Sequence, residues 1–484
     1  MNAVWTAYEA AAATGGALCA RGGDPDDWSM EEWSARGLSI DTRTLKPGEI
    51  FLALKDARDG HDFVPAAFKA GASAAVVSRT LDQAPDGAPL LLVPDTMAAL
   101  RDLAAVARDR NFGKRIGVTG SAGKTSTKEI LRTVLAACGR AHAADKSFNN
   151  YLGVPLTLAA LPLRADYSVY EIGMNHAGEI TPLTELVRPH AAIVTTVGEA
   201  HLEFFDSVEG IAEAKAEIFR GLPEGGAAII PLDNAYAPLL TRRALEAGAR
   251  IITFGESEQA DYRLTGYRPG EEGAEIEAAV PEGFVTFRLA ATGRHQALNA
   301  LAALAAAEAV GADRTRLLGA FESAGAAAGR GRRERLRLAG KTITLIDESY
   351  NANPASMRAA LAGLAETEPG PGGRRIVVFG DMLELGPDAP ALHAGLAPDL
   401  ENAGVGRLYV AGDLAGALQD AVPEAMRAGA ADAALDLADR ILAEIKDGDV
   451  LMAKGSNASR VGALIARLRE IAEPAEGPPA APDD

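Results

Sequence analysis

The segment at residues 115–131, RIGVTGSAGKTSTKEIL, constrains the fold of this chain more than any other. An apolar run leads into a glycine-containing turn at residues 120–125. A helical pattern follows, in which Ile130, Val134 and Cys138 recur every four residues, so Cys138 is expected to be a small core residue. A strand, a tight turn and a helix in this order are typical of the first unit of a nucleotide-binding α/β domain.

The chemistry of the turn is that of a phosphate loop. Its glycines let backbone N–H groups point at phosphate oxygens, and the helix N-terminus adds partial positive charge. Lys124 can reach the β- and γ-phosphates of ATP, and the Thr125 hydroxyl can coordinate Mg²⁺. The predicted phosphate-binding residues are Gly120, Ser121, Ala122, Gly123, Lys124, Thr125 and Ser126.

The loop departs from the common GxxxxGK[ST] pattern, because Val118 stands where the first glycine is required. The chain has a shorter TGxxGKT form instead. A glycine-rich turn with an exposed lysine is the alternative interpretation, but the flanking strand and helix favour a phosphate loop.

Strands and helices alternate along the 484 residues, which predicts an α/β protein of about three domains. In the first part, SIDTRTL, EIFLAL, SAAVVS and PLLLVP are expected to be strands. A helix capped by Asp95 or Thr96 follows, with Leu100, Leu103, Val106 and Ala107 on one face. The predicted units are a small N-terminal α/β domain (1–94), a central ATP-binding domain with a mostly parallel sheet (95–312), a C-terminal doubly wound domain (313–472) and a disordered tail (473–484).

Composition excludes several classes of protein. The formal net charge of −18 disfavours a partner such as nucleic acid or an anionic membrane. The two cysteines, Cys19 and Cys138, exclude a disulfide framework and a four-cysteine zinc site. Neither a signal peptide nor a membrane span is predicted, so we expect a soluble, cytoplasmic protein.

Three further side chains are candidates for the chemistry. Glu171 is the only charge of the apolar strand SVYEI and stands at its end, where a Mg²⁺ ligand is favoured over a merely solvated acid. His201 follows the strand AAIVTTV, although a lone histidine is more often structural. Lys215 lies on the apolar stripe of an amphipathic helix, between Ile211 and Ile218. A lysine there must extend its ammonium group to solvent, pair with another group or change its chemistry. Periodicity alone does not decide between the first, structural alternative and a functional role.

Taken together, several segments resemble one family, the Mur ligases, which are ATP-dependent amino-acid ligases of peptidoglycan precursor synthesis. They are TGSAGKTSTKE, SFNNYLGVPLTL, EIGMNHAGEI, VGEAHLEFFDSVEGIAEAKAEIF, GRHQALNALAALA, DESYNANPASMRAAL, VFGDMLELG and LMAKGSNASR. DESYNANP and EIGMNHAGEI discriminate best. They are most similar to the branch that adds D-alanyl-D-alanine to UDP-N-acetylmuramoyl-tripeptide, and SIDTRTLKPGEIFLALKDARDGHDF resembles its UDP-binding domain.

The resemblance implies roles for individual residues. Lys124 would hold the ATP phosphates, Thr125 and Glu171 one Mg²⁺, and Glu171, His201 and Lys215 a second, with Lys215 present as a carbamate formed with CO₂. Lys124, His201 and Lys215 would be catalytic. Asn299 would contact adenine, although Gln296 stands where an asparagine is more usual. Arg330 or Arg332 would approach the phosphates, and Asp347 or Glu348 would hold the ribose.

The resemblance also implies substrate contacts. Ser39, Thr42 and Arg43 would bind on the uridine nucleotide side and Asn149 and Asn150 the UDP-sugar, whereas Asn351, Asn353 and Lys454 would lie near the active cleft. The expected reaction joins the tripeptide carboxylate to D-alanyl-D-alanine through an acyl phosphate, in a monomer whose C-terminal domain is expected to close over ATP. The third residue of the peptide is not readable from the sequence.

Rival interpretations differ in class. A DNPR motif, typical of the relative that adds meso-diaminopimelate, is absent from the sequence. Folylpolyglutamate synthase shares the fold but would not be expected to carry DESYNANP. A P-loop switch or motor ATPase would turn over ATP without either peptide substrate, and a silent binding module would not need Lys124, Glu171, His201 and Lys215.

Overall fold

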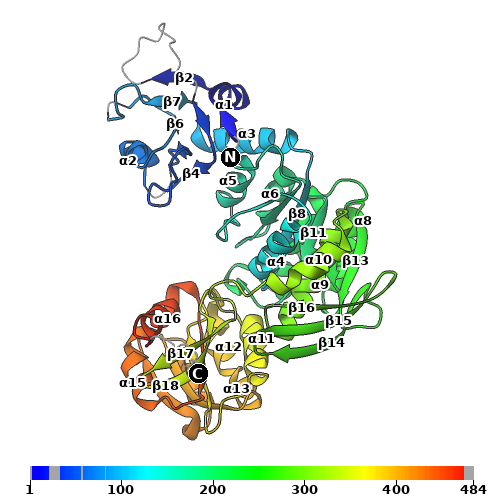
Figure 1. The fold of residues 1–484 in the computed structure, drawn as a ribbon, viewed down its shortest axis with the longest axis vertical. Helices are drawn as coiled ribbons and strands as arrows, with labels where there is room; N and C mark the ends of the chain where they lie inside the picture. Colours follow the sequence, from blue (N-terminus) through cyan, green and yellow to red (C-terminus); the bar gives the residue numbers. More distant parts are fainter. Residues whose placement is uncertain (1–2, 21–32, 56–57, 82, 474–484) are drawn as a thin grey trace, which may run out of the picture.

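The structure, a computed structural model, describes residues 3–20, 33–55, 58–81 and 83–473. Three α/β bodies follow one another along the longest axis of the molecule (Figure 1). We call them the N-terminal, middle and C-terminal bodies, after sheets of five, nine and six strands. The predicted α/β class with mostly parallel sheets is confirmed, whereas residues 474–484 of the predicted disordered tail lie outside the described residues.

The N-terminal sheet has the strand order β2-β7-β6-β5-β4. Its elements, with the small β1–β3 pair, are β1 (Trp5–Thr6), α1 (Ala7–Thr14), β2 (Ala17–Ala20), β3 (Ser34–Ala35), β4 (Leu38–Ser39), β5 (Ile50–Leu52), η1 (Gly60–Phe63), α2 (Val64–Lys69), β6 (Ala74–Val77) and β7 (Pro89–Leu92). The strand predicted over SIDTRTL is wrong beyond Ser39. The backbone N–H groups of Thr44 and Leu45 both donate to the Asp41 carbonyl, which closes a turn there.

Helix α3 (Thr96–Asp109) joins the N-terminal body to the middle body. Asp95 caps it by accepting a hydrogen bond from the Ala98 N–H at 2.8 Å, as one of the two predicted caps. Leu100, Leu103 and Ala107 are buried in the core with α5 and α6, as predicted, but Val106 is 38% exposed. The apolar face of α3 is therefore narrower than the sequence pattern indicates.

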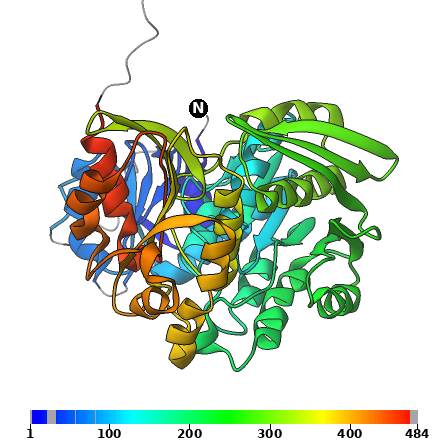
Figure 2. The same ribbon diagram turned by 90° about the horizontal axis from the view of Figure 1, so that it is seen from below.

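The middle sheet has the strand order β16-β15-β14-β13-β12-β11-β8-β10-β9. The strands β9 to β14 and β8 pair in parallel, and β14, β15 and β16 form an antiparallel extension that projects from the molecule in Figure 2. The strands are β8 (Lys114–Thr119), β9 (Ala141–Ala143), β10 (Tyr167–Glu171), β11 (Ala191–Val194), β12 (Ala227–Pro231), β13 (Arg250–Gly255), β14 (Tyr262–Gly270), β15 (Gly273–Val280) and β16 (Gly283–Leu289).

Helices cover both faces of this sheet. The helices are α4 (Lys124–Ala136), α5 (Gly153–Ala159), α6 (Ile180–Val187), α7 (Val208–Ala216), α8 (Ala237–Glu246), α9 (Arg294–Ala309) and α10 (Arg314–Ala320), with short turns η2 (Leu202–Phe204), η3 (Glu217–Gly221) and η4 (Phe321–Ser323). Alternate strand residues enter two separate cores: Ile193 packs with α4 and α9, and Ala192 and Val194 pack with α3 and α6.

Helix α9 is buried on all sides, and every residue from 299 to 307 has less than a tenth of its surface exposed. Its alanines let it pack closely against strands β11 to β14 and against α4, which lies beside it on the same face of the sheet. Cys138 lies beyond the end of α4 and is partly buried at the edge of the same core. The expectation that Cys138 is a small core residue is thus met only at the periphery.

The C-terminal sheet has the strand order β17-β18-β22-β19-β20-β21, antiparallel only between β17 and β18. Its strands are β17 (Arg332–Leu338), β18 (Lys341–Glu348), β19 (Arg375–Gly380), β20 (Val405–Ala411), β21 (Arg427–Ala431) and β22 (Val450–Lys454). Its helices are α11 (Pro354–Ala365), α12 (Ala389–Ala394), α13 (Ala397–Asn402), α14 (Gly416–Ala421), α15 (Ala438–Glu444) and α16 (Val461–Glu470), with turns η5 (Gly386–Asp388), η6 (Glu424–Met426), η7 (Ala434–Leu437) and η8 (Asn457–Ser459). Among the described residues, no helix combines the length and apolar character needed to cross a membrane.

Candidate active site

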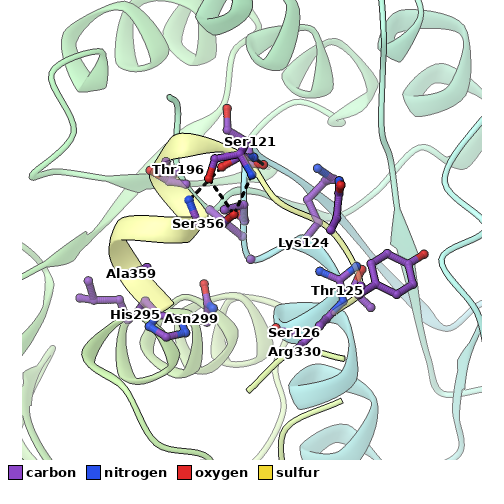
Figure 3. A pocket seen from close by; sticks show the side chains of 18 of the residues that line it. Ser121, Lys124, Thr125, Ser126, Thr196, His295, Asn299, Arg330, Ser356 and Ala359 are labelled. Carbon is purple, nitrogen blue, oxygen red and sulfur yellow. Dashed lines mark hydrogen bonds between the residues drawn. The ribbon is translucent and has the colours of Figure 1, made fainter. Parts of the chain in front are cut away.

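A cavity of about 500 Å³ lies where the middle and C-terminal bodies meet. In Figure 3 the start of α4, helix α9 and the yellow helix α11 face it from three directions. The ends of β10, β11, β12 and β13 supply further lining residues. The cavity therefore occupies the carboxyl edge of the middle sheet, where parallel sheets place their ligands.

The phosphate loop requires glycine at two positions. Gly120 has a φ of 151°, and a Cβ there would lie 1.9 Å from the Thr195 hydroxyl oxygen. Gly123 has a φ of 83°, and a Cβ there would lie 2.7 Å from Asn299 Oδ1. Gly123 also begins α4 without any side-chain cap, so the first N–H groups of the helix face the cavity free for an anion.

Lys124 is directed back into its own loop. Its ammonium group donates a hydrogen bond to the Gly120 carbonyl at 2.6 Å. Burial lowers the pKa of Lys124, opposed by the charge of Glu171 and assisted by that of Arg330. A phosphate group in the loop would supply further negative charge beside this partly buried cation.

Thr125 and Glu171 meet as the resemblance implies. The Thr125 hydroxyl donates to Glu171 Oε2 at 2.7 Å, and the Asn149 amide donates to Glu171 Oε1 at 2.8 Å. Glu171 is 3% exposed and lines the cavity. A hydroxyl and a carboxylate oxygen side by side form a set of hard ligands suited to Mg²⁺.

His201 belongs to the lining of the same cavity, whereas Lys215 is outside the lining but close enough to Lys124 and His201 for their charges to interact. His201 lines the cavity, and burial lowers its pKa, with Lys124 and Lys215 acting in the same direction. Lys215 is 1% exposed, so the predicted burial on the apolar stripe of α7 is confirmed and snorkelling is excluded. Its side-chain nitrogen makes no hydrogen bond or ion pair with any described residue. Burial, assisted by the positive charge of Lys124, holds the pKa of Lys215 well below its ordinary value.

The C-terminal body reaches the phosphate loop through helix α11. Asn353 caps this helix by accepting from the Ser356 N–H at 2.8 Å, and its amide donates to the Ser121 carbonyl at 3.1 Å. Ser121 in turn exchanges hydrogen bonds of 3.0 Å with both backbone groups of Gly198. Asn353 thus links the C-terminal body to the loop at residues 120–125 and to the segment that leads to His201.

The two residues of each predicted alternative, Arg330 or Arg332 and Asp347 or Glu348, lie in different surroundings. Arg330 lines the cavity and stacks 4.1 Å from the Tyr350 ring centre, whereas Arg332 is exposed. Glu348 lines the cavity 3.4 Å from the Lys454 ammonium group. Asp347 is outside the lining: it pairs with Arg469 at 2.8 Å and accepts from Ser349. Successive residues of strand β18 point to opposite faces, so only one of the two acids can face the cavity.

Most of the other predicted residues are brought to the cavity: Ser126, Asn149, Asn299, Asn351, Asn353 and Lys454 line it. Gln296 also lines it and accepts a long hydrogen bond of 3.5 Å from Asn299. Ser39, Thr42 and Arg43 lie in the N-terminal body and contribute nothing to the lining. Asn150 is also outside it, because its side chain caps the turn before α5.

Sequence reasoning missed several lining residues, among them Asp233, Asn234, His295 and Tyr350. Asp233 and Asn234 stand two and three residues after the end of β12, much as Glu171 ends β10, so the same strand-end rule would have found them. His295 carried no such signal, since it stands in the first turn of α9.

Comparisons with known proteins agree with this geometry. Residues 118–307 match the model of the Mur ligase middle domain, and residues 331–457 match the Mur ligase, glutamate ligase domain. The chain is 39% identical over 386 residues to UDP-N-acetylmuramoyl-tripeptide–D-alanyl-D-alanine ligase of Escherichia coli, covering 79% of this chain and 83% of that one. It is 34% identical over 452 residues to the ligase of the same name from Bacillus subtilis, covering 91% and 94%.

Solved structures agree as well. A crystal structure of MurF from Acinetobacter baumannii superposes with a TM-score of 0.82 at 31% identity, covering 96% of this chain and 99% of that one. MurF ligase from Thermotoga maritima in complex with ADP superposes with a TM-score of 0.75 at 26% identity, covering 90% and 98%. With both family models matched and relatives aligned over most of its length, the chain belongs to the Mur ligase family.

Proposed function

We propose that this chain joins D-alanyl-D-alanine to UDP-N-acetylmuramoyl-tripeptide at the expense of ATP, giving the pentapeptide precursor of peptidoglycan. The name and the extent of the curated relatives support this substrate pair. The observation that carries the proposal is the cavity itself, where the phosphate loop, the Thr125–Glu171 pair and the N-terminus of α11 converge.

The residues present fit a bound Mg²⁺. Glu171 and Thr125 would hold one ion, which supplies charge neutralisation at the transferred phosphoryl group. The described residues contain no cluster of three or more His, Cys, Asp and Glu side chains that could hold a metal. A second ion held by Glu171 and His201 would therefore need another anionic ligand.

Lys215 is suited to supply that ligand as a carbamate. Its amine is buried and has a lowered pKa, which favours the neutral form that attacks CO₂. The neutral amine nitrogen would bond to the CO₂ carbon, one C=O electron pair would move onto oxygen, and the nitrogen would lose a proton to solvent, so a neutral amine becomes an anionic carbamate. The carbamate would place a negative charge near the Lys124 ammonium group, where a second positive charge is disfavoured.

The proposed reaction has two steps. Lys124 and the N-terminus of α4 hold the phosphates of ATP while the tripeptide carboxylate attacks the γ-phosphorus, which gives an acyl phosphate and ADP. The amine of D-alanyl-D-alanine then attacks the acyl carbon, phosphate leaves, and a peptide bond remains. Catalysis rests on positioning and on cationic groups around the developing charge, with Arg330 and Lys454 close by.

The contacts with the UDP-linked substrate and with the nucleoside of ATP are proposals too. Ser39, Thr42 and Arg43 would contact the uridine nucleotide from the N-terminal body, and Asn149 the UDP-sugar near the cavity. Asn299 would contact adenine from α9, and Glu348, which lines the cavity, would hold the ribose.

Phosphate release from ATP tests the reaction. Turnover should require UDP-N-acetylmuramoyl-tripeptide and D-alanyl-D-alanine together, and oxygen-18 in the tripeptide carboxylate should reach the released phosphate. Equal turnover without either peptide substrate would instead support a switch or motor ATPase. Label that stays out of the phosphate would contradict the acyl-phosphate route.

A further inference from the structure

A contact between the middle and C-terminal bodies places a carboxylate on His201. Glu384 Oε2 lies 2.6 Å from His201 Nδ1. The two residues are 183 positions apart, Glu384 standing on the loop between β19 and η5 and His201 just before η2. The Glu203 N–H also donates to the Glu384 carbonyl at 3.2 Å, so backbone and side chain dock together.

The loop that carries Glu384 is fixed from inside the C-terminal body. The Met382 N–H donates to His393 Nε2 at 2.9 Å, and His393 is fully buried. The Leu383 N–H donates to the Ser456 hydroxyl at 3.0 Å. Glu384 is therefore presented by a rigid support, although its own side chain is 46% exposed.

Both partners have strained backbones. His201 and Glu384 each have a φ of 61°, in the left-handed region that non-glycine residues seldom adopt. Such a conformation persists only where surrounding contacts impose it, and it is most often found at functional sites. The sequence motif VFGDMLELG, which contains Glu384, has no role in the proposed reaction so far.

The hydrogen bond determines what His201 can do. A carboxylate only accepts, so the proton of a neutral imidazole must lie on Nδ1 and the lone pair on Nε2. Among the described residues, His201 Nε2 has no hydrogen-bond partner, and His201 lines the cavity. The charged groups that face the ring are Glu384, Lys124 and Lys215.

We propose that Glu384 is a positioning residue, which fixes the ring and the tautomer of His201 when the C-terminal body is docked. Because Glu384 belongs to the C-terminal body, the His201 ring is aimed at the cavity only in the docked arrangement. Catalysis is thereby restricted to the enzyme that has enclosed its nucleotide. This inference rests on the proposed function, but its principal test does not require turnover.

Nitrogen-15 NMR of the full chain labelled at its seven histidines gives that test. The His201 signals are identified by their loss in His201→Gln, and spectra are recorded with and without a non-hydrolysable ATP analogue. We expect the Nδ1–H tautomer in the wild type with the analogue and in Glu384→Gln, which keeps an accepting oxygen. Glu384→Ala should show the Nε2–H form or a mixture.

Kinetics gives the second readout. Glu384→Ala should lower kcat about 10- to 100-fold, as is usual for losing the partner that orients a functional histidine, with a smaller change in the KM for ATP. Glu384→Gln should recover most of this loss. Glu203→Ala, which removes an exposed carboxylate from the same contact region, is the matched control and should leave both constants unchanged.

Two results would overturn the inference: an unchanged His201 tautomer in Glu384→Ala, or equal kcat in Glu384→Ala and the wild type. A wild type that shows the Nδ1–H tautomer but no turnover dependent on D-alanyl-D-alanine would contradict the proposed function alone. The two failures are therefore distinguishable.

Discussion

Thr125 Oγ1 and Glu171 Oε2 are 2.7 Å apart, although 46 residues separate them in sequence. The parallel pairing of β8 and β10, which sets Glu171 opposite Val118, brings the end of β10 to the phosphate loop. A slip of one residue in this register would turn the Glu171 side chain to the opposite face of the sheet and away from the loop. The most informative experiments concern the residues that surround this pair.

Lys215→Ala should lower kcat by about 100- to 1000-fold, the range for losing a group that stabilises developing charge. Short carboxylic acids such as acetate should restore part of the activity by occupying the space of the carbamate. With ¹³C-labelled CO₂, the wild type should show a carbamate signal that Lys215→Ala lacks. The exposed Lys69→Ala is the control, and full activity of Lys215→Ala without rescue would exclude the carbamate.

Arg330→Ala should raise the KM for ATP about tenfold, which corresponds to about 1.4 kcal/mol. The physical reason is that Arg330 lies in the cavity, held over Tyr350 and close enough to Lys124 to lower its pKa. Arg332→Ala, two residues away and exposed, should behave as the wild type. Steady-state kinetics with varied ATP measures both, and the reverse pattern would show that the wrong arginine has been assigned.

Asn353→Asp should separate the two tasks of this residue. Aspartate still caps α11, so the melting temperature should stay close to that of the wild type. It has no amide to donate to the Ser121 carbonyl, however, and we expect a clear fall in kcat. Asn353→Ala should lose the cap as well, at a cost of about 0.5–2 kcal/mol in the free energy of unfolding. Unchanged kcat in Asn353→Asp would remove the link to Ser121 from the mechanism.

Stability should fall as the pH decreases from about 6.5 to about 4. Burial, assisted by the charges of Arg115 and Lys114, lowers the pKa of His190 from 6.5 to about 4, and its Nδ1 accepts from the Arg115 N–H. In that window the unfolded chain binds a proton that the folded chain refuses, so acid favours unfolding. Urea midpoints at several pH values measure the effect.

His190→Gln, which cannot be protonated, should show a smaller loss of stability over the same pH range. His176→Gln, at an exposed histidine, is the control and should follow the wild type. If the slope is the same in His190→Gln as in the wild type, another group causes the acid sensitivity.

Sequence reasoning succeeded where local pattern and chemistry coincide. The strand, turn and helix at residues 114–136 depend only on neighbouring residues, and the burial of Lys215 follows from the period of α7. Phosphate binding by the turn stays a prediction. The strand error at SIDTRTL has a local cause, because Asp41 offers the backbone a turn that competes with the short strand β4. The antiparallel extension β14–β16 was not predicted, because its partners are determined by the neighbouring sheet.

The C-terminal half of the site could not be predicted in the same way. Asp347 and Glu348 are adjacent, and only the position of β18 in its sheet decides which one faces the cavity. The contacts of Asn353 with Ser121 and of Glu384 with His201 each join two bodies. No periodicity within either segment reports such a contact. The predicted boundary near residue 312 stays a prediction, although α10 beyond it packs against α4 and β16.

The lining of the cavity by two bodies has a kinetic consequence. Under the proposed function, ADP and inorganic phosphate leave a cavity that both bodies line, so we expect their release to depend on how firmly the C-terminal body holds the loop at residues 120–125. Substitutions that tighten this seam, for instance around the Arg358–Glu199 ion pair, should protect the reactive intermediate from hydrolysis but delay each new catalytic cycle. Under the proposed function, residues of this one interface would therefore affect both the hydrolysis of the acyl phosphate and the rate of product release.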